Sequence, residues 1–148
     1  MLVLFQDAQR VPAMLAPFGA IPTTELREWL RQNALVLPSD LIELWEVTGG
    51  GDIFETETVF RPTVSAIQNP SFQDDIESRN AAHSAKGKPS GLYTFQEGAF
   101  LSAIRLSDQR FVTLTNDYVP SNSFDSLDDW YVHTLRAEFG ERYGLLPL

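Results

Sequence analysis

The chain has 148 residues and a formal net charge of −9, and 43% of its residues are hydrophobic. This length and composition predict one globular domain over residues 1–148. The acidic balance argues against a nucleic-acid or membrane-surface binder, because both need a basic face. No apolar run reaches the roughly 20 residues that span a bilayer, and there is no cysteine, so we expect a cytoplasmic protein without disulfides.

The first third of the chain predicts two helices. Residues 2–5 are apolar but few, and they indicate a first strand or a packed arm. Thr23 or Thr24 can cap a helix that runs to about Asn33, with its apolar residues on one face. Ser39 is a good N-cap for a second helix over residues 39–48, and the three glycines that follow can end it.

The middle of the chain combines strands with a long polar stretch. Alternating residues predict a strand over residues 56–60. Residues 66–90 are rich in loop-forming residues and indicate a flexible excursion, part of which, around Asp74–Ala82, can be helical. Three further strands are expected, at residues 92–95, 100–106 and 111–115. A short turn between the last two predicts a hairpin.

The last part of the chain predicts a loop over residues 120–123 and then a helix. Ser126, with Asp129 three residues later, is similar to a capping box. The expected buried stripe of this helix is Leu127, Tyr131, Leu135 and Phe139. Gly140 or Gly144 can end it. The order of helices, strands and a final helix predicts an α+β fold, a mostly antiparallel sheet with helices packed on it.

Motifs for catalysis and cofactor binding are missing from the sequence. The Gly49-Gly50-Gly51 run ends a helix, whereas a phosphate loop opens one. His83 and His133 lack metal-ligand spacing, and we interpret His83 as a solvated loop residue and His133 as a helix-surface residue. No nucleophile motif occurs, so we predict a non-enzyme with no catalytic residue, cofactor or metal site. Scattered carboxylates that meet in space are the one route to catalysis left open.

Acidic residues are concentrated between Asp40 and Glu57, where six acids occur without a base. Some of them serve helix dipoles and caps, but Asp52, Glu55 and Glu57 have no such duty and flank turn and strand positions expected to be exposed. We therefore predict a partner-binding surface at these three acids, which would attract a basic protein. The alternative is that the acidity serves solubility alone.

Aromatic side chains supply the other half of the predicted interface. Phe54, Phe60 and Tyr118 are candidates for the desolvated contacts that dominate binding energy. Phe54 and Tyr118 are assigned to the partner surface together with the acids. Packing in the core is the competing role for all three aromatic residues.

Three segments, in order along the chain, resemble the SUKH superfamily in its Smi/Knr-type branch. The first runs from Leu37-Pro38-Ser39-Asp40-Leu41 through Leu44 and Trp45 to Thr48-Gly49-Gly50-Gly51. The second, Gly98 to Leu114, is similar to the central hairpin of that family. The third, Phe124 to Tyr131, is similar to the start of its C-terminal helix. The resemblance covers about residues 23–142.

The resemblance implies a SUKH-like α+β domain without a catalytic residue set. Bacterial members of the family are mostly immunity proteins, which bind and neutralise toxin domains, often nucleases, delivered between competing cells. The expected function is therefore neutralisation of a cognate toxin in a polymorphic or contact-dependent system. A regulatory or scaffold domain that binds an endogenous protein is the alternative, because a fold does not fix a function.

Overall fold

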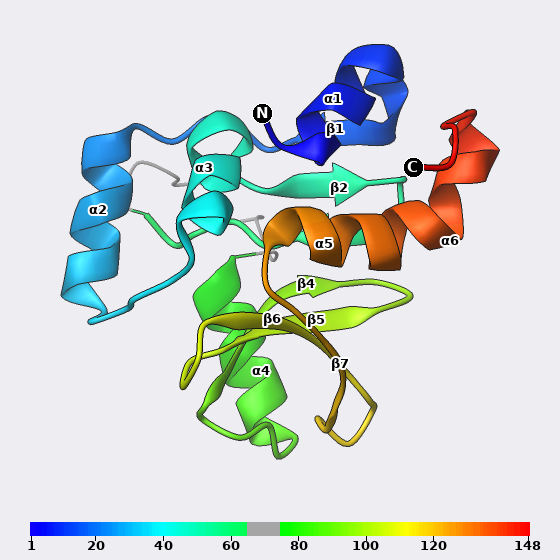
Figure 1. Ribbon diagram of the computed structural model, residues 1–148. Helices are drawn as coiled ribbons and strands as arrows, with labels where there is room; N and C mark the ends of the chain where they lie inside the picture. Colours follow the sequence, from blue (N-terminus) through cyan, green and yellow to red (C-terminus); the bar gives the residue numbers. More distant parts are fainter. Residues whose placement is uncertain (65–74) are drawn as a thin grey trace.

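Antiparallel strands form one seven-stranded sheet in the computed structural model, which describes residues 1–64 and 75–148 (Figure 1). Each strand pairs with the next strand along the chain, in the order β1-β2-β3-β4-β5-β6-β7. The strands are β1 (Leu15–Pro17), β2 (Gly51–Ile53), β3 (Glu57–Val59), β4 (Leu92–Glu97), β5 (Leu101–Arg105), β6 (Arg110–Leu114) and β7 (Pro120–Phe124). The predicted α+β class with an antiparallel sheet is confirmed.

Helices are inserted between the strands and follow the last one. The α-helices are α1 (Val3–Arg10), α2 (Thr23–Gln32), α3 (Ser39–Thr48), α4 (Ile76–Ala85), α5 (Leu127–Tyr131) and α6 (Ala137–Phe139). Further helical segments differ from the α-helix in their winding. The tighter 3₁₀ segments are η1 (Pro12–Met14) and η3 (Gly140–Tyr143), and the wider π-helical segment is η2 (Val132–Arg136). Thus α2 and α3 lie between β1 and β2 in the chain, and α4 lies between β3 and β4.

Two side-chain contacts place α4 and α5 on opposite faces of the sheet. The indole of Trp130 in α5 donates a hydrogen bond to Ser102 Oγ at 2.9 Å. On α4, Asn80 Oδ1 accepts one from Thr94 Oγ1, also at 2.9 Å. Thr94 pairs with Ala103, the neighbour of Ser102. Since successive strand residues point to opposite faces, the sheet is a layer between α4 and the C-terminal helix.

A strand was one of the two expectations for residues 2–5, and this expectation is wrong, because the segment begins α1. Leu4 and Asp7 lie about one helical turn apart and are both buried. The N–H of Val3 donates to Asp128 Oδ1 at 2.9 Å, which attaches the start of α1 to the C-terminal helix. A short apolar run has no period of its own, so the sequence could not distinguish a strand from a helix here.

The next two helices lie where the sequence predicts them. Gly49 ends α3 with a φ of 68°, in the left-handed region, as expected of a glycine C-cap. The N-cap residues are Pro22 for α2 and Pro38 for α3, however. Thr23 and Ser39 are already the first helical residues, so the capping roles predicted for Thr23 or Thr24 and for Ser39 are wrong. The predicted helix in the polar stretch is confirmed as α4, while residues 66–74 of the expected excursion lie outside the described residues.

The predicted strands of the second half are confirmed as β4, β5 and β6, and the strand expected at residues 56–60 is β3. Residues 120–123 were expected to be a loop but belong to β7. This strand lies at the edge of the described sheet. Its residues from Pro120 to Ser123 are all exposed, so it lacks the alternation of buried and exposed side chains that would mark a strand in the sequence. An edge position tolerates Pro120 at the start of a strand, because proline has no N–H to donate.

The C-terminal helix begins as predicted and continues in an unexpected form. Ser126 Oγ accepts a hydrogen bond from the N–H of Asp129 at 3.1 Å, so the predicted N-cap is confirmed. The four residues of the expected apolar stripe are buried. The helix widens into η2 before α6, and Gly144, with a φ of 76°, ends the last turn.

Candidate functional site

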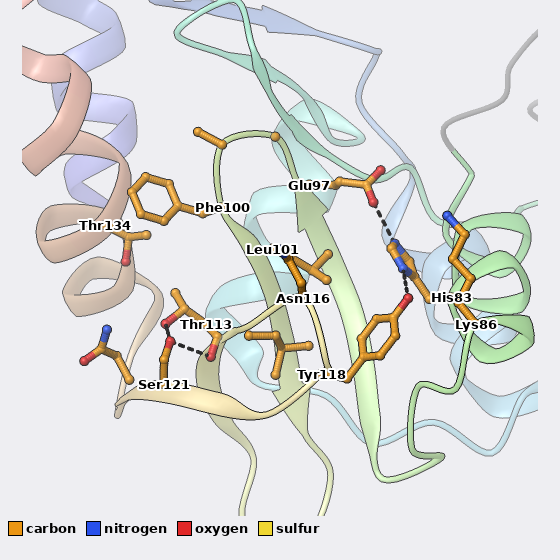
Figure 2. A pocket seen from close by; sticks show the side chains of 14 residues that line it. His83, Lys86, Glu97, Phe100, Leu101, Thr113, Asn116, Tyr118, Ser121 and Thr134 are labelled. Carbon is orange, nitrogen blue, oxygen red and sulfur yellow. Dashed lines mark hydrogen bonds and ion pairs between the residues drawn. The ribbon is translucent and has the colours of Figure 1, made fainter.

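A pocket of about 420 Å³ lies at the end of the sheet, between the β4–β5 turn and the β6–β7 turn (Figure 2). It extends from α4 to η2. One end, here called the His83 end, is lined by His83, Lys86, Glu97 and Tyr118. The other, here called the Thr134 end, is lined by Thr113, Ser121, Asn122 and Thr134. The volume falls within the range of about 300–1,000 Å³ that is typical of small-molecule sites.

The His83 end is built around a buried histidine whose two ring nitrogens both face a polar neighbour. Nδ1 lies 2.9 Å from the phenol oxygen of Tyr118, and Nε2 lies 2.7 Å from Oε1 of Glu97 (Figure 2). Arg79 pairs with the other carboxylate oxygen of Glu97. Burial is the largest effect on the pKa of His83 and lowers it; the Glu97 carboxylate raises this pKa, while the positive charges of Arg79 and Lys86 lower it further, and the net shift is downward. The approach of Nε2 to Glu97 does not have hydrogen-bond geometry, so within the described residues the ring makes its hydrogen bond through Nδ1 and Tyr118.

This geometry suits a structural role for His83. A general base needs a ring nitrogen within hydrogen-bond reach of a substrate proton. Here the two nitrogens face Tyr118 and Glu97 instead, and thereby connect α4 to the β6–β7 turn and to β4. His83 therefore holds the walls of the pocket together, and the solvated position predicted for it is wrong, since its exposed fraction is 5%.

Uncharged hydroxyl and amide groups line the Thr134 end. The Oγ1 atom of Thr113 and the Oγ atom of Ser121 lie 2.9 Å apart, and the Ser121 hydroxyl also lies 3.2 Å from the carbonyl oxygen of Thr113. Thr134 is 4% exposed, yet its Oγ1 atom has no hydrogen-bond partner among residues 1–64 and 75–148. Buried hydroxyl groups in proteins are normally paired, so this atom calls for an explanation.

Three departures from regular backbone geometry surround the pocket. β7 carries one extra residue, Ser121, opposite β6. Tyr118 has a φ of 62°, which is uncommon for an aromatic residue. Thr134 lies in the π-helical segment η2. Bulges and π segments change the direction of side chains and are frequent at functional sites. In this chain the bulge lets Ser121 and Asn122, neighbours in one strand, line the same pocket.

Glu57, one of the acids predicted at the partner surface, lies beneath the rim of this pocket. Its exposed fraction is 0%. Its carboxylate accepts hydrogen bonds from the N–H groups of Ala99 and Phe100, at 2.9 and 3.2 Å, and from Gln96 Nε2 at 3.2 Å. The predicted exposure of Glu57 is wrong, because its carboxylate is buried and accepts the hydrogen bonds that hold the β4–β5 turn in place.

The aromatic residues assigned to the partner surface are also buried. Phe54 is 2% exposed and lies 5.0 Å, between ring centroids, from Tyr143. Tyr118 is 8% exposed and faces His83, and Phe60 is buried as well. These buried positions support the competing role of all three aromatic residues, which is packing in the core. Tyr118 still lines the pocket through the part of its side chain that stays accessible.

Asp52 and Glu55 keep surface positions. Glu55 is exposed, and Asp52 is half-buried and accepts a hydrogen bond from Thr58 Oγ1 at 2.7 Å. Glu55 belongs to the β2–β3 turn, which ends at Glu57. Since Glu57 holds the β4–β5 turn, the β2–β3 turn lies beside the rim of the pocket. The structure thus brings two of the predicted acids to the same end of the sheet as the pocket.

The sequence analysis missed Thr134 and the role of α4. Ile76, Asn80 and His83 are spaced by four and three residues, and all three are buried. This spacing marks one face of a helix and could have indicated that His83 points inward. Nothing in the sequence distinguishes the Thr134 hydroxyl from that of any other threonine beside an apolar stripe.

Other functional classes find little support in the described part of the chain. Within it, no group of three or more His, Cys, Asp or Glu residues is placed to hold a metal ion. None of its helices combines the length and the apolar character needed to cross a membrane. The chain matches no protein-family model and no curated protein.

Proposed function

We propose that this chain is an immunity-type binding domain, which acts in the cytoplasm and neutralises a basic toxin domain by covering its active surface. In this proposal the chain catalyses no reaction. The resemblance of three sequence segments to the SUKH superfamily supports the functional class. The net charge of −9 supports a basic partner, because electrostatic attraction between oppositely charged proteins raises their association rate.

The strained β2–β3 turn is the observation that carries the choice of surface. Phe54 and Glu55 have φ values of 51° and 69°, in the left-handed region that residues other than glycine rarely adopt. Such strain costs on the order of 1–3 kcal/mol per residue and is concentrated at functional sites. Phe54 anchors the turn in the core, and this leaves Glu55 exposed at its tip.

The position of Glu55 fits contact with a cationic groove. The pKa of the Tyr143 phenol is raised by desolvation and by the Glu55 carboxylate, so the two groups lie near each other. Asp52 lies on the adjoining strand, one residue before Ile53, which pairs with Glu57. A pair of carboxylates at the end of the sheet can take the place of phosphates in the groove of a nuclease-type toxin.

Charge reversal tests this surface. The partner is the product of a neighbouring toxin-like gene, and the measurement is its association rate with the Asp52→Lys/Glu55→Lys variant at low and high salt. We expect the rate to fall about tenfold at low salt and less at high salt, where charges are screened. Glu43→Lys is the control for the single variant Glu55→Lys, because both make the same change in net charge and Glu43 is exposed on α3 within the same acidic stretch.

Two results would count against the proposal. The first is an equal loss of rate in the Glu43→Lys control, which would mean that only bulk charge matters. The second is the absence of binding to any toxin-like protein together with binding to an endogenous partner, which would favour the regulatory or scaffold function.

A further inference from the structure

Four buried polar side chains form a continuous line of hydrogen bonds between α5 and the start of β3, here called the buried network. The indole N–H of Trp130 donates to Ser102 Oγ at 2.9 Å, and the Ser102 hydroxyl donates to Oε1 of Gln96 at 2.6 Å. The amide nitrogen of Gln96 donates in turn to Oε1 of Glu57 at 3.2 Å. All four residues are 0% exposed, so bulk water does not compete for these bonds.

The two ends of the buried network fix the direction of every bond within it. An indole N–H can only donate, and an ionised carboxylate can only accept. The hydroxyl of Ser102 therefore accepts from Trp130 and donates to Gln96. This leaves one orientation for the Gln96 amide, with its oxygen toward the serine and its NH₂ group toward Glu57. The donor that faces the Glu57 carboxylate is thus set by groups on the far side of the network.

An irregularity in β4 makes the buried network possible. The pairing of β4 with β5 shifts register between Thr94 and Gln96, so Phe95 is an extra residue in β4. In a regular strand Thr94 and Gln96 would face the same side of the sheet, and Thr94 faces α4. The bulge turns Gln96 to the α5 side instead, where Ser102 lies. Bulges re-aim side chains and are common beside functional sites, so this one favours a specific role for Gln96.

The Glu57 end of the buried network holds two neighbouring turns at once. Oε2 of the carboxylate accepts from the Thr56 hydroxyl at 2.8 Å, directly after the strained Glu55. The same oxygen accepts from the N–H of Ala99 in the β4–β5 turn. A Cβ atom at Gly98 would lie 2.6 Å from the carbonyl oxygen of Thr56, so the two turns are in close contact. A displaced Glu57 carboxylate would therefore loosen both turns.

We infer that Ser102 and Gln96 are positioning residues, which fix the exposed Glu55 on the β2–β3 turn through the Glu57 carboxylate. Both side chains are fully buried, so their effect on Glu55 is indirect. The consequence for binding rests on the proposed function, in which this turn contacts the toxin. A preorganised turn loses less conformational freedom on binding, whereas a loosened turn lowers the apparent affinity by the fraction of time spent in the competent conformation.

Backbone order parameters of Glu55 and Thr56, measured by NMR on the full chain, test this role without any partner. Ser102→Ala removes the hydroxyl that orients Gln96, so we expect both order parameters to fall from about 0.85 to below about 0.6.

Thr94→Val is the matched control, because it removes another buried hydroxyl of the same sheet, one that bonds to α4 and lies outside the buried network. It should lower the melting temperature by a similar amount and leave the turn rigid. An unchanged turn in Ser102→Ala, or an equal loosening in Thr94→Val, overturns the inference.

A double variant tests the order of the network. If Ser102 acts through Gln96, then Gln96→Met and Gln96→Met/Ser102→Ala should loosen the turn to the same degree. A clearly greater loosening in the double variant overturns that order.

The affinity of Ser102→Ala for the product of the neighbouring toxin-like gene separates this inference from the proposed function. We expect the affinity to fall roughly threefold, as the competent conformation becomes less populated. A loosened turn with unchanged affinity overturns the choice of Glu55 as the toxin surface and leaves the positioning of the turn standing. A turn that stays rigid overturns the positioning role, whatever the affinity.

Discussion

The carboxylate of Glu57 accepts a hydrogen bond from the backbone N–H of Ala99 at 2.9 Å, across 42 positions of sequence. This contact fixes the β4–β5 turn against the start of β3, and with it one rim of the pocket. Gly98 makes the approach feasible, because a Cβ atom there would overlap the Glu57 carboxylate. A fully buried acid therefore determines the shape of a surface that it does not reach.

Replacing Glu57 by glutamine should lower the free energy of unfolding by about 3 kcal/mol. The carboxylate accepts bonds from several donors, and a glutamine NH₂ group would place a donor against the N–H of Ala99 or Phe100. Urea unfolding measures the effect. The exposed neighbour provides the control, since Glu55→Gln should stay within about 0.5 kcal/mol. Equal effects of the two changes would contradict the assigned role of Glu57.

Arg136 and Asp7 should prove strongly coupled in a double-mutant cycle. Arg136 Nε lies 2.7 Å from Asp7 Oδ2, and their side chains are 6% and 2% exposed. Breaking a buried pair leaves a charge without compensation, so Arg136→Met should cost about 3–5 kcal/mol. Adding Asp7→Asn should restore part of that loss. The surface pair of Arg31 and Glu28 is the comparison, and urea unfolding that shows additive losses in the buried cycle would contradict the coupling.

Acid should destabilise the fold through His83. Its ordinary pKa is 6.5, and burial lowers this pKa in the folded chain. The unfolded chain therefore binds more protons as the pH falls below about 6.5, and the free energy of unfolding falls with it until the folded pKa is passed. Denaturation at a series of pH values should show this slope in the native chain and a smaller one in His83→Gln. The exposed His133 is the control, and His133→Gln should keep the slope.

Three glycine variants separate steric overlap from backbone strain. Gly49 has a φ of 68°, and a Cβ atom there would overlap the carbonyl oxygen of Gly19, so Gly49→Ala should cost more than about 3 kcal/mol. Gly87 has a φ of 105°, and a Cβ atom there would meet no other atom of the described residues within 4 Å, so Gly87→Ala should cost about 1–2 kcal/mol of strain. Gly91→Ala meets neither problem and should be nearly neutral. Thermal unfolding that ranks them differently would contradict the assigned packing of Gly49.

Local signals along the chain predicted much of the fold. The glycine stop at Gly49, the cap at Ser126 and the apolar stripe of the last helix each depend on neighbouring residues, and all three are confirmed. β7 was missed because its residues are polar and because its pairing with β6 depends on the folded structure and not on the local sequence. Residues 2–5 were ambiguous because a run so short carries no period.

The site was harder to predict, because it depends on where buried polar groups find partners. Glu57 was expected on the surface because acids are mostly exposed, but its bonds come from residues about 40 positions further along the chain. Tyr118 and His83 meet across 35 positions. Charge counting located Asp52 and Glu55 on the surface but could not reveal that the Asp40–Glu57 stretch also contains a buried carboxylate.

The pairing of Asp7 with Arg136 also bears on the order of folding during synthesis. The two residues are 129 positions apart, and synthesis proceeds from the amino end. Asp7 must therefore remain hydrated, and α1 undocked, until the last helix has been made. A chain shortened before Arg136 would leave the acid with no cation to bury against, so C-terminal truncation should release the first helix for proteases even though the strands between them are complete.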